Sequence, residues 1–340
     1  MTFDERVGAL RGLGFSERQT RFLVTVALHS GFCLPRQYAA FAGLQYGAGV
    51  RDFFDRLVVR KLARRLTFRP DRGHVYQLHA SWIYDRIGQS DNRNRRHTSP
   101  ALIARKLMLL DYVLQEPGAD WYATEADKLA LFTTRFGLST ADLPRRKYVS
   151  KDRRAPDTVR YFVHKLPISF RPESGQVTLV YLVTEATSDP FAQFVEDHLA
   201  MLGRLPLWRI VAVGPRHSRG LQACGAALAR IAQGRSKSRP IAEVDALEQY
   251  FTWREAHQRG DHSWLTDVNR VAVQWHTLRR RFAAMEYEQL FERWKLEGPF
   301  ALPMPVGASL LKALNNRSGQ LELHSLPIRY DRFGTRPGVS

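Results

Sequence analysis

The chain has 340 residues, of which 44% are hydrophobic and 11% aromatic, a composition that indicates a folded protein of two or three domains and excludes a disordered tail. Its 51 Lys and Arg against 33 Asp and Glu give a formal net charge of +18, which favours a polyanionic partner, either a nucleic acid or an acidic membrane surface. No apolar run is long enough to span a bilayer, and no apolar leader segment opens the sequence. We therefore expect a protein of the reducing cytoplasm without a membrane partner, in which Cys33 and Cys224 are free thiols.

The first ninety residues predict three helices followed by a β-hairpin. The first helix begins after the N-cap candidate Ser16, and a short second helix has Pro35 in its first turn. The third helix runs over residues 46–62, where apolar side chains recur with the 3.6-residue period. Two strands follow, one on each side of a turn at residues 70–73. This order is typical of a winged helix-turn-helix domain, which we place at residues 1–90.

A winged helix inserts its third helix into the DNA major groove and lays its hairpin along the backbone. The candidates for DNA binding are therefore exposed side chains at the start of that helix and basic side chains of the helix and hairpin: Gln45, Tyr46, Arg51, Arg56, Arg60, Lys61, Arg64, Arg65, Arg69 and Arg72. Such a cluster displaces counterions from DNA and gives salt-dependent affinity. Asp52 and Asp55 interrupt it, which favours base readout or intramolecular pairing over dense phosphate contact. A solvated basic face and a protein-binding winged helix are the alternatives.

Residues 91–145 predict a polar linker followed by connecting helices. The helix over residues 101–115 carries an apolar stripe, and Thr124 opens a capping-box pattern ahead of a second helix. The stripe is suited either to packing within the chain or to dimerisation. Together with the aromatic residues near the C-terminus it leads us to expect a homodimer on DNA.

Residues 146–240 follow the order strand, strand, strand, helix, strand, helix, which predicts a sheet with covering helices. This order suits a nuclease-like α/β core, in which Asp157 and Glu185 would stand at adjacent strand ends and hold Mg²⁺. Thr187 occupies the position of the lysine that would act on the attacking water. Lys165 lies eight residues along the predicted strand from Asp157, on the order of 26 Å away. We therefore expect a non-catalytic domain without metal or cofactor; a metal-dependent nuclease that uses Asp157 and Glu185 is the alternative.

Other metal and nucleotide motifs are weak or missing from the sequence. His29 and Cys33 are four residues apart and could share a metal, but two ligands alone are a weak signal and a packed helix end is the preferred interpretation. No Cys-x-x-Cys pair and no phosphate-cradling Gly-x-x-x-x-Gly-Lys motif occur.

The last hundred residues, 241–340, predict a helical extension with helices at 241–258 and 264–295. Tryptophan is unusually dense in them, at Trp253, Trp264, Trp275 and Trp294. A hydrophobic core contact is the preferred interpretation, and a protein-partner interface is the alternative.

From about residue 10 to residue 235, the order of these patterns resembles the replication-relaxation family of plasmids and integrative elements. The resemblance is carried by the run from FSERQTRFLVTVALHS to HVYQLHASW, the histidine-led helix HTSPALIARKLMLLDYVL, the Pro-Asp pair in RAPDTV, and the strand VYLVTEATS followed by PFAQFVEDHLAML and WRIVAVG. It implies a second domain similar to the restriction-endonuclease fold with an incomplete active site.

The resemblance also implies a role in the replication, mobilisation or regulation of mobile elements. We therefore expect an α+β multidomain protein: a winged helix-turn-helix, a central α/β restriction-endonuclease-like domain and a C-terminal helical extension. It would bind duplex DNA sequence-specifically at the bacterial nucleoid and regulate transcription. A replication or mobilisation accessory protein that binds an origin is the alternative.

Overall fold

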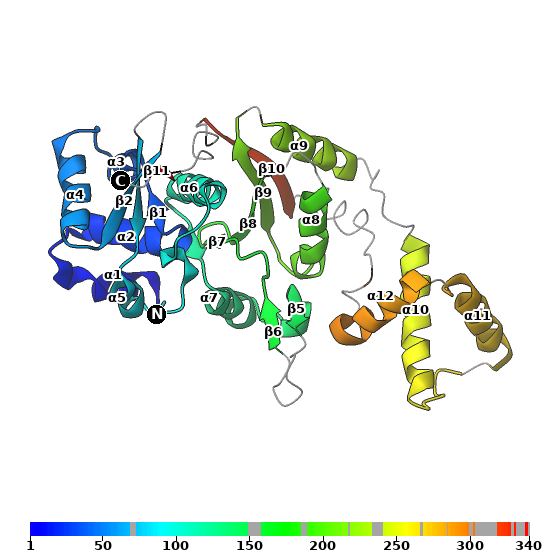
Figure 1. Ribbon diagram of the computed structural model, residues 1–340. Coiled ribbons are helices and arrows are strands. Elements are labelled where there is room, and N and C mark those ends of the chain that lie inside the picture. Colours follow the sequence, from blue (N-terminus) through cyan, green and yellow to red (C-terminus); the bar gives the residue numbers. More distant parts are fainter. Residues whose placement is uncertain are drawn as a thin grey trace.

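The computed structural model describes residues 1–68, 73–148, 158–184, 189–216, 218–232, 241–265, 268–283, 285–298, 302, 318–327, 330 and 337–338. These residues form helices and three sheets, so the architecture is mixed and compatible with the predicted α+β class. From left to right, Figure 1 shows an N-terminal unit, helix α6, a five-stranded central sheet with helices α8 and α9, and three C-terminal helices. None of the described helices is long and apolar enough to cross a membrane.

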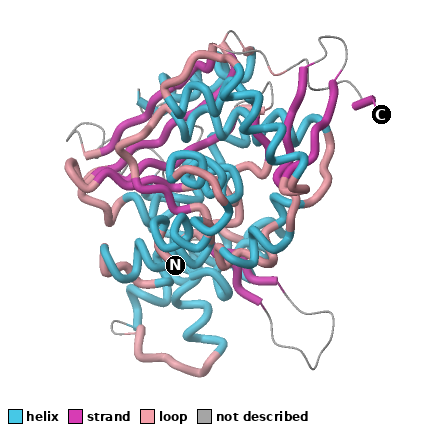
Figure 2. Tube along the Cα trace, turned by 90° about the vertical axis from the view of Figure 1, so that its left-hand side faces the viewer, coloured by secondary structure: helices cyan, strands magenta, loops and turns pink. Residues whose placement is uncertain are grey.

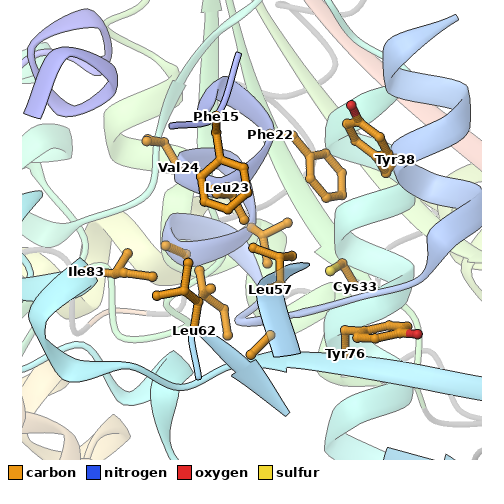
Figure 3. Close-up of a cluster of buried hydrophobic side chains, with 14 of the residues drawn as sticks. Phe15, Phe22, Leu23, Val24, Cys33, Tyr38, Leu57, Leu62, Tyr76 and Ile83 are labelled. Carbon is orange, nitrogen blue, oxygen red and sulfur yellow. The ribbon is translucent and has the colours of Figure 1, made fainter. Parts of the chain in front are cut away.

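The N-terminal unit packs helices against a small antiparallel sheet, in the order that the sequence predicts. After a short helix α1 (Phe3–Ala9) come α2 (Glu17–His29), β1 (Phe32–Cys33), α3 (Pro35–Ala42), α4 (Ala48–Val59), β2 (Ala63–Phe68) and β3 (Gly73–Leu78). The three strands pair in the order β1-β3-β2. Apolar side chains at helical spacing on α2 and α4 meet alternate residues of the strands, so that Phe22, Leu57 and Tyr76 share one core (Figure 3).

Local chemistry sets both ends of α2. The Ser16 hydroxyl accepts the N–H of Gln19 at 3.3 Å, and the Gln19 side chain accepts the N–H of Ser16 at 3.0 Å, which confirms the predicted N-cap. At the other end Gly31 has a φ of +76°, and a Cβ there would lie 2.1 Å from the Asn94 carbonyl oxygen. Glycine at this position therefore lets the segment that carries Asn94 lie directly against the helix end.

Helix α6 (Pro100–Leu114) joins the N-terminal unit to the central sheet and is covered on both sides. Phe32 and Val75 of the small sheet belong to the same apolar cluster as Leu107 of α6 and as Val180 and Val211 of the central sheet. Except for Leu102, which is 38% exposed, the apolar stripe of this helix is thus covered within the chain. It is not available for the homodimer that the sequence analysis predicted from it.

A buried carboxylate fastens α6 to two other segments. The two carboxylate oxygens of Asp111 accept hydrogen bonds from the guanidinium of Arg36, at the start of α3, at 2.7 Å each. The hydroxyl of Tyr330 donates to the same carboxylate. Burial and the neighbouring Asp111 raise the pKa of Tyr330, so the phenol stays protonated and remains a donor.

The central sheet has the strand order β10-β9-β8-β7-β4. Its strands are β4 (Asp120–Tyr122), β7 (Ile168–Arg171), β8 (Gln176–Leu182), β9 (Trp208–Pro215) and β10 (Gly319–Leu326). Strands β4, β7 and β8 pair antiparallel, whereas β8, β9 and β10 are parallel. Helices α8 (Asp189–Leu202) and α9 (Arg219–Ala232) cover one face, and α6 covers the other. Strand β4 comes from the segment that was predicted to contain only a linker and helices.

The strand predicted over residues 157–170 is in fact two strands in different sheets. β6 (Thr158–Tyr161) pairs with β5 (Arg145–Tyr148) in a separate hairpin, which projects from the body of the molecule (Figures 1 and 2). The backbone of Phe162 and Lys165 has positive φ angles of 50° and 57°, so the chain turns before it enters β7. The expected separation of Lys165 from residue 157 along one extended strand is therefore wrong.

The predicted helical extension over residues 241–340 is wrong near its end. The alternating segment GQLELHSL forms β10, which pairs in parallel with β9 along its whole length. A Cβ at Gly319 would lie 2.3 Å from the ring of Trp208, so glycine is required where that ring passes the strand. Near the C-terminus, β11 (Pro337–Gly338) pairs with β2.

The C-terminal helices are α10 (Ile241–Gln258), α11 (Val268–Arg281) and α12 (Met285–Glu297), where the sequence predicted one helix over 264–295 in place of the last two. A straight helix of that length would extend about 48 Å. The break lets Phe282 and Phe291 both pack beside α10 in one cluster. The four tryptophans meet in the same unit: Trp294 is part of its core, Trp253 and Trp275 pack against it, and Trp264 lies against both. The core-contact interpretation is confirmed for Trp294, whereas the other three tryptophans are half-buried.

Candidate nucleic-acid interface

Apolar packing sets the rotation of α4 about its axis. Val50, Phe53, Phe54 and Leu57 are fully buried in the core of the N-terminal unit. The ring centroid of Phe53 lies 4.3 Å from that of Tyr38 on α3. The ring centroid of Phe54 lies 4.4 Å from that of Tyr76 on β3. These contacts hold the helix between α3 and the small sheet, so its opposite face is turned to solvent.

The start of α4 exposes a row of polar and charged side chains. Tyr46, just before the helix, is 63% exposed, and Gln45 beside it is exposed as well. On the helix, Arg51, Asp52 and Asp55 are also exposed. Both signs of charge thus meet on one short helical surface.

Two basic residues that were predicted to bind DNA point to the other side of α4. Arg56 and Arg60 lie over the ring of Phe15, with centroid distances of 5.4 and 5.2 Å. The guanidinium of Arg60 donates to the carbonyl oxygen of Leu13, and that of Arg56 donates to the Gln19 side chain at 3.4 Å. The structure therefore holds both residues against the segment between α1 and α2, away from Arg51.

The two neighbouring arginines of β2 face opposite sides of the small sheet. Arg64 donates to the Gln77 side chain at 2.7 Å, and Gln77 in turn donates to the carbonyl oxygens of Arg95 and Arg96 at 3.0 and 2.9 Å. Arg65 is paired with Tyr76 across the strands, on the face that packs against α4. The predicted basic cluster is therefore not one surface.

The pKa of the Tyr76 hydroxyl indicates which ionisable side chains lie near Tyr76, the cross-strand neighbour of Arg65. Burial raises the pKa of the Tyr76 hydroxyl, Asp55 raises it further, Arg65 lowers it, and Tyr46 acts on it as well. Asp55, Arg65 and Tyr46 are therefore near enough to act electrostatically on one phenol. We use the name recognition face for the set Gln45, Tyr46, Arg51, Asp52, Asp55 and Arg65.

The charged side chains of the recognition face form no ion pairs with other described residues. Within the described part of the chain, no ion pair includes Arg51, Asp52, Asp55 or Arg65. The intramolecular pairing considered for the two aspartates is therefore not found among the described residues. Lys61 is exposed with a φ of 56° at the opposite end of α4 from Tyr46.

Four of the predicted site residues cannot be placed. Arg69 and Arg72 at the hairpin tip lie outside the described residues, as do Asp157 and Glu185 of the alternative nuclease site. The strands that the two acids flank are nevertheless described. β6, which follows Asp157, belongs to the separate hairpin, whereas β8, which precedes Glu185, has β7 and β9 as its neighbours. The expectation of adjacent strand ends in one sheet is therefore wrong.

Basic and aromatic side chains also line a cavity of about 620 Å³ between α10 and α11. Tyr250 and Trp275 form part of its wall together with the neighbouring arginines Arg279 and Arg280. The pocket also includes Arg254, whose guanidinium is held by Glu288 at 2.6 and 2.9 Å. The residues that line this cavity are separated along the sequence, so sequence patterns do not show that they lie together.

Among the described residues, no group of three or more histidine, cysteine, aspartate or glutamate side chains is arranged to hold a metal ion. The sequence matches no protein-family model, no curated protein and no solved structure.

Proposed function

We propose that the chain is a sequence-specific duplex-DNA-binding protein whose N-terminal unit is a winged helix-turn-helix. The observation that carries the proposal is the recognition face, a solvent-exposed helix start beside a two-stranded hairpin. In such a unit α4 enters the major groove and presents its N-terminal side chains to base edges, while the hairpin follows the backbone.

The mixed charge of the recognition face favours base readout over simple phosphate binding. Arg51 can donate two hydrogen bonds to guanine, Gln45 can bond both edge atoms of adenine, and Asp52 or Asp55 can accept from the cytosine amino group. A surface that only neutralised phosphates would be uniformly basic, because carboxylates repel the backbone. The formal net charge of +18 supplies the long-range attraction that brings the protein to DNA.

Regulation of transcription in a mobile genetic element is the proposed use, supported by the resemblance to the replication-relaxation family. A replication or mobilisation accessory protein would use the same recognition face at an origin, and footprinting on the DNA that flanks its own gene separates the two. A homodimer on DNA stays a prediction. It would need a surface other than α6, and the C-terminal helices are the remaining candidate.

The central sheet, in this proposal, is a non-catalytic scaffold. A metal-dependent nuclease needs at least two carboxylates on its metal and a positive group near the attacking water. β7, the strand that flanks β8 on one side, reads ISFR and contains no carboxylate, and the described residues of β9 on the other side contain none either. This supports a chain that binds DNA without cutting it.

Replacing Arg51 by alanine should weaken binding to the preferred duplex by about 1–3 kcal/mol, roughly 5- to 150-fold, because a bidentate contact to a guanine is lost. Affinity for a duplex of scrambled sequence should hardly change, so the ratio of the affinities for the preferred and the scrambled duplex should decrease. The preferred duplex is first selected from a random pool, and both affinities are then measured by fluorescence anisotropy at fixed salt.

Arg56→Ala is the matched control, since it removes the same charge from the same helix but on the side that faces Phe15. We expect this variant to retain the sequence preference of the unmodified protein. If Arg51→Ala and Arg56→Ala lower affinity equally for both duplexes, α4 does not read bases through the recognition face and the proposal is wrong.

Supercoiled plasmid that carries the selected site should stay intact when it is incubated with the protein and Mg²⁺ or Mn²⁺. Gel electrophoresis of the plasmid over time is the measurement. Nicking that disappears in the Asp157→Asn variant would replace the scaffold proposal by the nuclease alternative. Glu185→Gln should leave DNA affinity unchanged.

A further inference from the structure

A cavity of about 1010 Å³ lies where the N-terminal unit, α7 (Glu125–Ala130) and the β5–β6 hairpin meet. Its wall includes the end of α2, the segment around the 3-10 turn Arg93–Arg95, and the turn between β6 and β7. Its acidic side chains are Asp91 and Glu125. Five cationic side chains also line it: Arg93, Arg96, Lys128, Arg160 and Lys165. The wall therefore carries a net positive charge assembled from several elements.

Lys128 is the most unusual of these cations because it is buried and, among the described residues, has no carboxylate as an ion-pair partner. Its side chain is only 2% exposed, and its ammonium donates to the carbonyl oxygen of Leu166 at 2.6 Å. An ammonium has three N–H groups, so one carbonyl leaves donors to spare. Buried charges in proteins are ordinarily paired, since desolvation of an unpaired charge is costly.

The nearest acids are committed to other groups. Asp127 accepts two hydrogen bonds from Arg6, at 3.1 and 3.2 Å. Glu125 accepts the backbone N–H of Tyr161 at 2.9 Å and lies 3.6 Å from the guanidinium of Arg160. Within the described ranges no carboxylate forms an ion pair with Lys128. Glu125 and Asp127 still act on the Lys128 ammonium electrostatically, and the centroid of the Phe162 ring lies 5.7 Å from it, but none of these contacts is an ion pair. An anion in the cavity would supply one.

His29 adds a second unsatisfied polar group to the same wall. Its Nδ1 is buried and has no hydrogen-bond partner. Burial, with Lys128 and Arg6 nearby, lowers the pKa of His29 to about 3, so the ring is neutral at physiological pH. A neutral imidazole offers one donor and one acceptor, which suits a ligand oxygen or hydroxyl.

We propose that this cavity binds a phosphorylated small molecule, with the phosphate against Lys128 and the exposed arginines Arg93 and Arg96 at the cavity wall. Phosphate is favoured over a single carboxylate because cations from separate elements line the same cavity, and a multiply charged anion can bind more than one of them. The volume lies at the upper end of small-molecule sites, and Tyr148 and Tyr161 supply aromatic wall for the rest of the ligand.

Inorganic pyrophosphate is the probe, titrated into the full-length chain by isothermal calorimetry at constant ionic strength and pH 7. We expect one site per chain, with affinity at least tenfold weaker in Lys128→Met. The double variant Arg93→Ala/Arg96→Ala should weaken binding as well, and since both side chains are exposed it keeps the test independent of any loss of folding in Lys128→Met. Arg51→Ala/Arg65→Ala is the charge-matched control and should leave pyrophosphate affinity unchanged.

Two outcomes would overturn the proposal. One is wild-type affinity in both cavity variants. The other is loss of binding in the Arg51→Ala/Arg65→Ala control alone, which would place the pyrophosphate on the recognition face. The titration contains no DNA, so its result is independent of whether the proposed DNA binding holds.

Discussion

Asp111→Ala should lower the free energy of unfolding by about 3 kcal/mol, one of the two largest effects expected for a single substitution in this protein. The carboxylate is buried, it accepts two 2.7 Å hydrogen bonds from Arg36, and it accepts the hydroxyl of Tyr330. Its removal leaves a partly buried guanidinium and a buried phenol without their acceptor. Most of the loss in free energy of unfolding comes from those unpaired groups, and less from the lost attraction between Asp111 and Arg36.

Chemical denaturation followed by circular dichroism measures this effect. Asp85→Ala, which removes an exposed carboxylate from helix α5 (Ser81–Arg86), is the control and should change stability by less than about 0.5 kcal/mol. Asp111→Asn should fall between the two, because the amide retains one acceptor oxygen and loses the charge. Equal stability of Asp111→Ala and the unmodified protein would mean that this carboxylate does not fasten α3 and Tyr330 to α6.

Lys128→Met should have the opposite effect and stabilise the protein by about 2 kcal/mol at pH 7. Burial lowers the pKa of Lys128 from 10.5 to about 8, so the folded protein holds this proton less tightly than the unfolded chain. The difference corresponds to about 3 kcal/mol of destabilisation, and the hydrogen bond to Leu166 offsets about 1 kcal/mol of it. Methionine has similar length and no charge to desolvate.

The pH dependence of stability is a second test of whether Lys128→Met stabilises the protein. Below pH 8 both folded and unfolded states carry the proton, and the full destabilisation is present. As the pH rises from about 8 towards 10.5, the folded protein loses the proton first and its stability relative to Lys128→Met recovers. Stability is measured in phosphate-free buffer between pH 7 and pH 10, with Lys61→Met as an exposed control.

A less stable Lys128→Met at pH 7 would show that the ammonium is well compensated in the free protein. That result would also remove the main reason to place an anion in the cavity. A gain in stability together with a loss of pyrophosphate affinity would instead separate the two roles of the residue, since the ligand would supply the counter-charge that the chain lacks.

Segments whose structure depends on near neighbours could be predicted from the sequence. The periodicity of Val50, Phe53, Phe54 and Leu57 gave the buried face of α4, and the Ser16 cap gave the start of α2. These features follow from the 3.6-residue turn and from hydrogen bonds that span three residues. The exposed positions Gln45, Tyr46 and Arg51 at the start of α4 could be predicted for the same reason.

Which neighbour meets each exposed side chain was a matter of tertiary structure. The spacing of Arg56 and Arg60 puts them on one side of α4, but only the packing of α1 and α2 shows that Phe15 and Leu13 lie there. The predicted basic cluster therefore divided among three surfaces. Arg64 and Arg65 separate because alternate residues of a strand face opposite sides of the sheet.

Local sequence patterns are enough to predict a basic, folded chain with helices and strands in this order, including the exposed start of α4 beside a hairpin. They do not predict that β4 and β10 join the central sheet, that α6 is covered on both sides, or that Lys128 is buried without an ion-pair partner among the described residues. Periodicity is imposed by backbone geometry over a few residues, whereas strand pairing and burial depend on segments as distant as β9 and β10, between which more than 100 residues of chain lie.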